Sequence, residues 1–380
     1  MSYEKNKAKY FNQYPAISDL EAKAKERLPF VSWEYLQSGT GKEDLLQRNI
    51  DAFKHITFEP QFCKGLLQAN IETTVFGRKY AAPFGVAPVG LTGLMWPNIE
   101  VYLAQTAKRY NIPYSLSTVA TETPETVGKV VGDMGWFQLY PPRDPEILKD
   151  LLKRAQDNGF HTLLITADVP MPSRRERTKR AGMQMPPKLT PQLIWQGITH
   201  PAWTRATLKR GLPRLRTVEK YAQSQDMTFV SGFVGNRLGG TLDWEYCKKV
   251  KDLWKGPVLL KGVMHPKDAE KAIEIGLDGV VVSNHGGRQF DGAKAAIEAL
   301  PDIVETIGDK ATIIFDSGVR TGLDIMRAIS LGADFVLLGR AFIYGVAALG
   351  EFGGDHVVEI LMDDLKNNMV QLGVSNIDAL

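Results

Sequence analysis

One histidine lies in a sequence context that suits proton transfer. His285 comes shortly after the apolar run Gly279–Val282, and two glycines and Arg288 follow it. Histidine titrates near neutral pH and can act as a general base, and glycines let a ligand approach the backbone closely. Asp168, which follows another apolar run, could orient the imidazole ring and stabilise its protonated form. A lone histidine is often structural, but this context predicts that His285 is a catalytic base.

Two arginines lie close to these candidates in the sequence. Arg288 is three residues after His285, and Arg175 is seven residues after Asp168. Either could be an exposed surface charge. Arginine is also the side chain that best matches a planar carboxylate, which it can bind with two parallel hydrogen bonds. Arginines beside a histidine base therefore indicate an anionic substrate.

The elements that would position these residues are eight short apolar runs. Each run is continuous rather than alternating, which is typical of strands buried on both faces in a parallel sheet. Helical patterns separate the runs, and eight strand–helix units favour a closed (β/α)8 TIM barrel over an open doubly wound sheet. We therefore predict an α/β fold with strands at Pro83–Ala87, Tyr114–Ser117, Trp136–Tyr140, Thr162–Thr166, Val258–Leu260, Gly279–Val282, Thr312–Phe315 and Phe335–Leu338.

Helices are expected before and between these runs. The first 60 residues show helical patterns, and a capping-box pattern at Ser18 predicts a helix start there. The fourth and fifth runs are about 90 residues apart, so a long loop insertion at about 174–240 is expected after the fourth strand. The chain, 1–380, is predicted to be one domain with its barrel at about 80–350. Helical patterns between the runs cover Asp144–Asp157, Pro266–Ile275, Ala293–Thr306 and Leu323–Ser330.

Chemistry in such barrels takes place just past the carboxyl ends of the strands. Polar residues or glycines follow all eight runs. Lys261 ends the fifth run and has two interpretations, a Schiff-base nucleophile or a fixed cation beside a flavin ring. The loops after the seventh and eighth runs, Asp316–Arg320 and Gly339-Arg340, occupy the usual phosphate-binding place of a TIM barrel. They predict a phosphorylated ligand.

The composition excludes several other classes of protein. The two cysteines, Cys63 and Cys247, form no CxxC motif, so neither a zinc site nor a disulfide framework is expected, and a reducing compartment fits. The first residues contain no apolar core of a signal peptide, and no apolar run reaches the roughly 18 residues that span a bilayer. We therefore expect a protein that is soluble or lies on a membrane surface.

The motifs together resemble the FMN-dependent L-2-hydroxy acid oxidases and dehydrogenases. The strongest is Ser283–Asp291, SNHGGRQFD, which looks like the active-site signature of that family. The resemblance runs from about Ile17 to the end of the chain. Within the family the sequence looks most like the bacterial L-lactate and mandelate dehydrogenases. The supporting motifs are Trp136–Tyr140, Leu260–Gly262, Asp316–Arg320 and Leu338–Arg340.

The resemblance implies roles for the residues that match the motifs. His285 would be the base and Asp168 its partner, and Tyr140 would hydrogen-bond the substrate oxygen at the reacting carbon. The substrate carboxylate would be bound by Tyr35, Arg175 and Arg288. The FMN ring and ribityl chain would contact Pro88, Val89, Gly90, Ser117, Gln138, Thr166, Lys261 and Ser283. The ribityl and phosphate site would include Asp316, Gly318, Arg320, Gly339 and Arg340.

The implied reaction oxidises an L-2-hydroxy acid to a 2-keto acid, with L-lactate the first substrate to test and larger or aromatic acids the second. Val89 and Val119 stand where some members have threonine and tryptophan, which favours a larger substrate. Ser317 stands where many members have glycine. The acceptor that reoxidises FMN is expected to be quinone, and the alternative is an oxidase that uses oxygen and produces hydrogen peroxide. Another phosphate-binding barrel enzyme with Lys261 as nucleophile is the second class, and an inactive flavin-binding scaffold is the third.

One segment carries the positive charge of the whole chain. Residues 174–220 contain 12 Lys and Arg against two acids, which is +10, whereas the rest of the chain is −7. With Trp195 and Trp203 among these cations, the segment is either a solvated lid or a surface that binds an anionic membrane. No nucleic-acid-binding module is present. We expect a cytoplasmic protein, peripheral on the inner face of the cell membrane if the segment binds lipid, and by family resemblance a homo-oligomer, commonly a tetramer.

Overall fold

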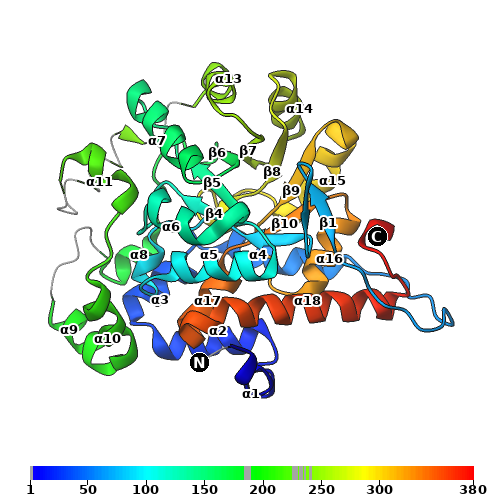
Figure 1. The fold of residues 1–380 in the computed structure, drawn as a ribbon, viewed down its shortest axis with the longest axis horizontal. Coiled ribbons are helices and arrows are strands. Elements are labelled where there is room, and N and C mark those ends of the chain that lie inside the picture. Colours follow the sequence, from blue (N-terminus) through cyan, green and yellow to red (C-terminus); the bar gives the residue numbers. More distant parts are fainter. Residues whose placement is uncertain (1–2, 184–189, 225–229, 231–233, 235–236, 239–241) are drawn as a thin grey trace.

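A computed structural model describes residues 3–183, 190–224, 230, 234, 237–238 and 242–380 of the chain. Part of the predicted insertion, including Lys188, lies outside these residues. Within them the chain forms a closed barrel of eight parallel strands surrounded by helices, as predicted (Figure 1). The strand order around the barrel is β10-β3-β4-β5-β6-β7-β8-β9, so neighbours in sequence are neighbours in space and β10 closes the barrel against β3.

The barrel strands lie where the apolar runs predicted them. Five of the eight have the predicted bounds, namely β4 (Tyr114–Ser117), β6 (Thr162–Thr166), β8 (Gly279–Val282), β9 (Thr312–Phe315) and β10 (Phe335–Leu338). The other three differ by one to three residues, and they are β3 (Phe84–Val86), β5 (Gly135–Leu139) and β7 (Val258–Val263).

The runs are continuous because both faces of each strand are buried. Leu164, Leu259 and Val281 point into the barrel, where they pack against one another, and the residues beside them in sequence join the apolar layer beneath the helices. The helices that follow the strands are α5 (Ile99–Tyr110), α6 (Pro124–Val131), α7 (Pro145–Asp157), α13 (Trp244–Leu253), α14 (Pro266–Glu274), α15 (Ala296–Ile307), α16 (Gly322–Ser330) and α17 (Arg340–Leu349).

Helices from both ends of the chain lie beside each other against the barrel (Figure 1). The amino-terminal ones are α1 (Lys7–Gln13), α2 (Ile17–Arg27), α3 (Phe30–Gln37) and α4 (Asp44–Asp51), and the last is α18 (Gly353–Leu372). The predicted start of a helix at Ser18 is wrong by two residues. α2 is capped at Ala16, whose backbone N–H donates to the Asp19 carboxylate at 2.9 Å. The Asp19 side chain, which lies in the first turn, thus accepts a hydrogen bond from the backbone N–H of the capping residue.

A two-stranded hairpin that the sequence did not predict covers the amino-terminal end of the barrel. Its strands are β1 (Thr73–Val75) and β2 (Arg78–Tyr80). Tyr80 is fully buried, packs on Trp136 and Phe335, and its hydroxyl oxygen accepts a hydrogen bond from Trp136 Nε1 at 3.2 Å. The hairpin therefore closes the end of the barrel that lies opposite the predicted site.

The insertion after β6 is helical and is anchored to the barrel. Its helices are α8 (Glu176–Arg180), α9 (Pro191–Thr199), α10 (Pro201–Arg210) and α11 (Arg216–Ala222), and α9 to α11 lie at one edge of the molecule (Figure 1). The buried Glu122 pairs with both Arg210 and Arg216. Trp203 Nε1 donates to the Leu94 carbonyl at 3.2 Å. Among the described residues, no helix is both long and apolar enough to cross a bilayer.

The barrel interior should dominate the stability of the fold. Leu164→Ala removes a fully buried side chain and should lower the free energy of unfolding by about 2–5 kcal/mol, as measured by urea denaturation. Leu66→Ala is the matched control, because Leu66 is 93% exposed, and should change it by less than about 0.5 kcal/mol. Equal effects of the two substitutions would contradict the assignment of Leu164 to the barrel core.

Candidate active site

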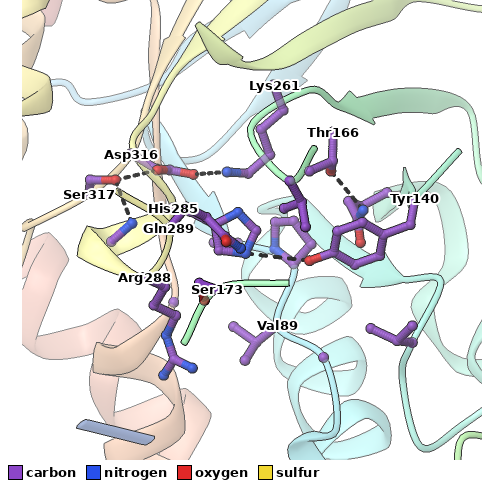
Figure 2. A pocket seen from close by; sticks show the side chains of 18 of the residues that line it. Val89, Tyr140, Thr166, Ser173, Lys261, His285, Arg288, Gln289, Asp316 and Ser317 are labelled. Carbon is purple, nitrogen blue, oxygen red and sulfur yellow. Dashed lines mark hydrogen bonds and ion pairs between the residues drawn. The ribbon is translucent and has the colours of Figure 1, made fainter. Parts of the chain in front are cut away.

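A pocket of about 570 Å³ opens at the carboxyl ends of the barrel strands. Residues within or directly after each of the eight strands contribute to its lining, together with Tyr35 and Leu36 of α3 and residues of the insertion. The predicted cluster of polar residues is therefore one site in space. Figure 2 shows how His285 and Arg288, which follow β8, converge there with Lys261 of β7 and with Tyr140, which follows β5.

His285 and Asp168 form a hydrogen-bonded pair at the wall of this pocket. The Asp168 carboxylate accepts a hydrogen bond from His285 Nδ1 at 2.9 Å. Burial raises the pKa of Asp168, but the neighbouring His285 and Lys261 outweigh burial and hold that pKa below its usual value. An ionised carboxylate can only accept, so it fixes the proton of a neutral His285 on Nδ1 and leaves Nε2 free to take a proton.

A glycine makes room for this pair. Gly262 of β7 has φ 101°, and a Cβ atom there would lie 2.5 Å from Asp168 Cβ. The pairing of β7 with β8 shifts register between Lys261 and Val263, around this glycine. Any larger residue at this position would displace the carboxylate that orients His285.

The loop that carries His285 has a strained backbone. His285 has φ 58°, although it is not glycine, and Gly286 and Gly287 follow with φ 63° and 77°. Side chains hold this conformation, because Ser283 Oγ accepts from His285 N at 3.1 Å and Asn284 Oδ1 accepts from Gly287 N at 3.1 Å. Three left-handed residues in succession turn the chain sharply, so the imidazole ring faces the pocket.

Two tyrosines add hydroxyl groups to the same wall. Tyr140 Oη lies 3.4 Å from His285 Nε2, and Tyr35 Oη donates to the Gly90 carbonyl at 3.4 Å. Burial, followed by the charge of Asp168, raises the pKa of Tyr140 above its usual value. Tyr140 therefore remains a neutral hydroxyl group that can donate a hydrogen bond to a ligand beside His285.

Five arginines line the pocket, and none forms an ion pair with a carboxylate in the part of the chain that the structure describes. One is Arg143, and the other four, Arg175, Arg288, Arg320 and Arg340, act on one another electrostatically. Burial, followed by the charge of Arg175, lowers the pKa of Arg288 to about 10. Burial and the other three arginines likewise place the pKa of Arg340 well below its usual value. This uncompensated positive charge favours the binding of anions.

The four arginines differ in how they are held. Arg288 Nη2 donates to the backbone carbonyls of Tyr35 and Leu36 at 3.0 and 2.6 Å. Arg340 donates to the carbonyls of Leu36, Ser38 and Gly286, which ties it to α3 as well as to the pocket.

Arg320 lies at the start of α16, next to a helix cap. The Asp324 carboxylate accepts from the backbone N–H groups of Arg320 and Thr321 at 3.0 and 3.1 Å, and Thr321 Oγ1 accepts from Asp324 N. The guanidinium group of Arg320 donates only to its neighbour's carbonyl, Val319 O, among the described residues. The guanidinium group also lies over the ring of Tyr344, 5.8 Å from the ring centroid, but unlike those of Arg288 and Arg340 it has no hydrogen bond to a distant part of the described chain.

Lys261 is a paired cation rather than a free amine. Its Nζ lies 2.8 Å from Asp316 Oδ2 and donates to Ser283 Oγ at 2.8 Å (Figure 2). Burial lowers the pKa of Lys261, but Asp316 and Asp168 outweigh burial and hold it above its usual value. A Schiff-base nucleophile must be deprotonated, so this environment disfavours the aldolase interpretation and supports a fixed positive charge.

The predicted site residues form two layers. Ser117, Asp168 and Ser283 do not line the pocket but bond residues that do. Ser117 Oγ donates to Gln138 Oε1, and Gln138 Nε2 donates to Thr166 Oγ1, each at 2.7 Å. Asp168 bonds His285, and Ser283 bonds Lys261. The predicted residues that line the pocket are Tyr35, Pro88, Val89, Gly90, Gln138, Tyr140, Thr166, Arg175, Lys261, His285, Arg288, Asp316, Gly318, Arg320, Gly339 and Arg340.

Several residues of the site were not predicted. Val234 and Leu238 of the insertion, with Met171 just before it, give the pocket an apolar wall. Val234 and Leu238 do not directly follow a predicted strand. Asn49 of α4 exchanges two hydrogen bonds with Asn284, Nδ2 to Oδ1 in each direction, at 2.7 and 2.8 Å. A single asparagine in an amphipathic helix gives no sequence signal of such a contact.

The chain belongs to the FMN-dependent dehydrogenase family, whose model matches residues 24–380. It is an FMN-dependent 2-hydroxy acid oxidoreductase. The sequence is 36% identical to the L-lactate dehydrogenase of Pseudomonas aeruginosa over 367 residues, 96% of each chain, and 37% identical to that of Stenotrophomonas maltophilia over 364 residues, 95% of this chain and 96% of the other.

Solved structures agree with this assignment. The structure of the monotopic membrane protein (S)-mandelate dehydrogenase superposes with a TM-score of 0.92 at 32% identity, covering 96% of this chain and 97% of the other. A mandelate oxidase superposes with a TM-score of 0.82 at 31% identity, covering 96% of each chain.

The pocket fits FMN on its own chemistry. The unpaired arginines after β9 and β10 match a phosphate group, and the charged Lys261 matches a ring that becomes negative on reduction. The backbone of the turn after β3, the Gln138 amide of β5 and the Thr166 hydroxyl group of β6 also line the pocket and can contact the rest of the cofactor.

Arg320 should contribute directly to cofactor affinity. Arg320→Ala removes a guanidinium group whose one hydrogen bond among the described residues is to Val319 O, and should weaken FMN binding roughly 10- to 100-fold, as measured by fluorescence titration of the apoprotein with FMN. Arg78→Ala on the hairpin at the opposite end of the barrel is the control and should leave FMN affinity unchanged. Unchanged affinity in Arg320→Ala would exclude Arg320 from the phosphate site.

Proposed function

We propose that this enzyme oxidises L-lactate or a larger, aromatic L-2-hydroxy acid to the 2-keto acid and passes the electrons to quinone. The observation that carries the proposal is the placement of His285 Nε2, Tyr140 Oη and two unpaired guanidinium groups around one pocket. A 2-hydroxy acid offers a carboxylate, a hydroxyl group and a Cα–H bond on adjacent atoms, and these match the three kinds of group in the pocket.

The arginines orient the substrate. Arg288 and Arg175 lie close enough for the charge of Arg175 to lower the pKa of Arg288, so one carboxylate between them would relieve this repulsion. Tyr35, whose ring lies under the guanidinium group of Arg288 at 5.4 Å, assists from α3. With the carboxylate held at this point, the reacting carbon faces His285 and the substrate oxygen faces Tyr140.

His285 takes the proton that the substrate loses. Oxidation to the 2-keto acid removes two electrons and two protons, one from Cα and one from the hydroxyl group. His285 Nε2 accepts one proton, and Asp168 stabilises the resulting imidazolium through Nδ1. Bound FMN would accept the two electrons together with the other proton.

The apolar wall supports a substrate larger than glycolate. Val89 and Val119 line the pocket together with Met171 and with Val234 and Leu238 of the insertion. Val119 lies against the turn after β3, where a Cβ atom on Gly90 would be 2.6 Å from Val119 Cγ2. The side chain of the acid would extend along this wall. The names of the relatives, L-lactate and mandelate dehydrogenases, define the two acids to compare first.

His285→Gln should abolish the reductive half-reaction and leave the flavin bound. Glutamine can still hydrogen-bond but cannot take a proton, so the rate of anaerobic flavin reduction should fall by at least roughly 100-fold, as measured by stopped-flow absorbance. The wild type is first screened against a panel of L-2-hydroxy acids. If none of them bleaches the wild-type flavin, the proposed function is wrong, and if the variant bleaches at the wild-type rate, His285 is not the base.

The same experiment, continued by adding an acceptor, separates the two candidate activities. We propose quinone because a membrane-bound dehydrogenase is among the relatives. A mandelate oxidase is also among them, which keeps the oxygen-using alternative. Reoxidation that is faster with a quinone analogue than with dissolved oxygen supports the dehydrogenase. Fast reoxidation by oxygen with release of hydrogen peroxide would make the protein an oxidase.

We also propose that the insertion rests on a membrane surface. Five large apolar residues on or just after α9 and α10 are each at least 53% exposed, and they are Ile194, Trp195, Ile198, Leu208 and Leu212. The name of one relative describes a monotopic membrane protein. Contact with the inner face of the cell membrane would bring the enzyme next to a lipid-soluble acceptor.

The positive charge of the insertion is less available to lipid than the sequence indicated. Many of its cations pair with acids of the protein, as Arg177 does with Glu34 and Glu43. Trp203 is also turned inward, with its indole N–H bonded to Leu94 O. The cations of 174–220 that have no ion pair among the described residues, apart from Arg175 in the pocket, are Lys179, Arg180, Arg205 and Lys209. Apolar contact should therefore contribute more than charge.

Trp195→Ser with Ile198→Ser should reduce binding to vesicles that contain anionic lipid. The loss of two exposed apolar side chains should lower the affinity at least roughly tenfold, as measured by vesicle sedimentation at low and high salt. Phe62→Ser with Leu66→Ser is the matched control, since both residues are exposed outside the insertion. Absence of wild-type binding at low salt would leave the insertion as a solvated lid.

For the assembly we propose a homo-oligomer, a tetramer as in the family, which light scattering tests.

A further inference from the structure

Ser317 has a backbone conformation that usually requires glycine. It directly follows Asp316 at the end of β9, is 9% exposed and has φ 88°. A residue with a Cβ atom is disfavoured in this region, and it persists only where its surroundings determine it. The side chain of Ser317 must therefore make contacts that compensate for the strain.

The Ser317 hydroxyl group uses all of its hydrogen-bonding capacity. Its proton is donated to Asp316 Oδ1 at 2.8 Å. Its oxygen accepts from Asn284 N at 3.3 Å and from Gly286 N at 3.0 Å. A hydroxyl group has one donor and two acceptor positions, so all three are filled. Two of these bonds reach the residues on either side of His285.

These bonds join two parts of the active site that are separate in sequence. The other oxygen of Asp316, Oδ2, pairs with Lys261 at 2.8 Å, and Lys261 donates to Ser283 Oγ at 2.8 Å. Ser283 Oγ in turn accepts from His285 N at 3.1 Å. Figure 2 shows the line from Lys261 through Asp316 to Ser317 and on to a backbone nitrogen of the neighbouring loop. The result is a closed ring of contacts around the base of the His285 loop.

We propose that Ser317 is a positioning residue for the reaction. Its hydroxyl group holds the left-handed loop that presents His285, and it also holds the carboxylate of Asp316 in place to pair with Lys261. It thereby links the cation at the flavin site to the base at the substrate site. The proposal rests on the proposed role of His285 as the base.

Two substitutions separate the hydroxyl group from the backbone strain. Ser317→Ala removes the hydroxyl group and keeps the Cβ atom at φ 88°, whereas Ser317→Gly removes both the hydroxyl group and the steric strain. Ser330→Ala is the matched control, because among the described residues that hydroxyl group bonds only a carbonyl, Arg327 O, at the end of α16 away from the pocket. A purely structural role would change the melting temperature and leave the chemistry intact.

The test is anaerobic flavin reduction of the FMN-loaded variants by the best 2-hydroxy acid, with the reduction potential of the bound flavin measured in parallel. In both Ser317 variants the limiting rate should fall roughly tenfold, since a displaced base reacts more slowly. The apparent Kd of the acid should stay unchanged because Arg175 and Arg288 are untouched. The potential should become more negative, because an Asp316 carboxylate that has lost its hydrogen-bond donor carries more uncompensated charge beside Lys261.

Wild-type rates and potential in both variants would overturn the proposal. A slow Ser317→Ala with a wild-type Ser317→Gly would also overturn it, since strain and not the hydroxyl group would then explain the effect. Failure of the proposed function looks different, because the wild type itself would then not be reduced by any acid. The potential of the two variants would still test the link between Ser317 and the Lys261–Asp316 pair.

Discussion

Positive charge with no neutralising carboxylate among the described residues is the constraint on which this site depends. Five guanidinium groups line one pocket, and the mutual repulsion of Arg175, Arg288, Arg320 and Arg340 contributes to lowering the pKa values of Arg288 and Arg340, which are the most enclosed of these four. Protein interiors rarely leave arginine unpaired, because an unpaired charge loses its hydration without gaining a partner. Such an arrangement is stable enough to persist where ligands supply the negative charge. A phosphate and a substrate carboxylate are the two anions that the family's reaction provides.

The fold can accommodate these unpaired charges because the apolar packing of the barrel stabilises it away from the pocket. The interior and the helix-facing layer are continuous apolar packing, and the hairpin closes the far end around Tyr80. At the rim, side-chain hydrogen bonds hold the positive φ angles of His285 and Ser317. The same rim receives residues from α3 and α4, so the amino-terminal helices are part of the site as well as of the core.

The strands and the convergence of polar residues could be predicted from the sequence because both follow from local rules. A continuous apolar run indicates a strand buried on both faces, and all carboxyl ends of a parallel barrel meet at one rim. Contacts that depend on three-dimensional packing could not be predicted. The insertion supplies Leu238 to the pocket, Trp203 turns toward the core, and Glu122 neutralises two arginines that the sequence counted as free charge. Ser117 and Ser283 match motif positions, yet they support other pocket residues instead of lining the pocket.

The most direct measurement is a crystal structure of the FMN-loaded enzyme with its unreactive product, the 2-keto acid. The account predicts that the carboxylate lies within hydrogen-bonding distance of both Arg175 and Arg288, with the carbonyl carbon facing His285 Nε2 and the carbonyl oxygen facing Tyr140. An acid bound with its carboxylate away from these two arginines, or with His285 turned out of the pocket, would contradict it.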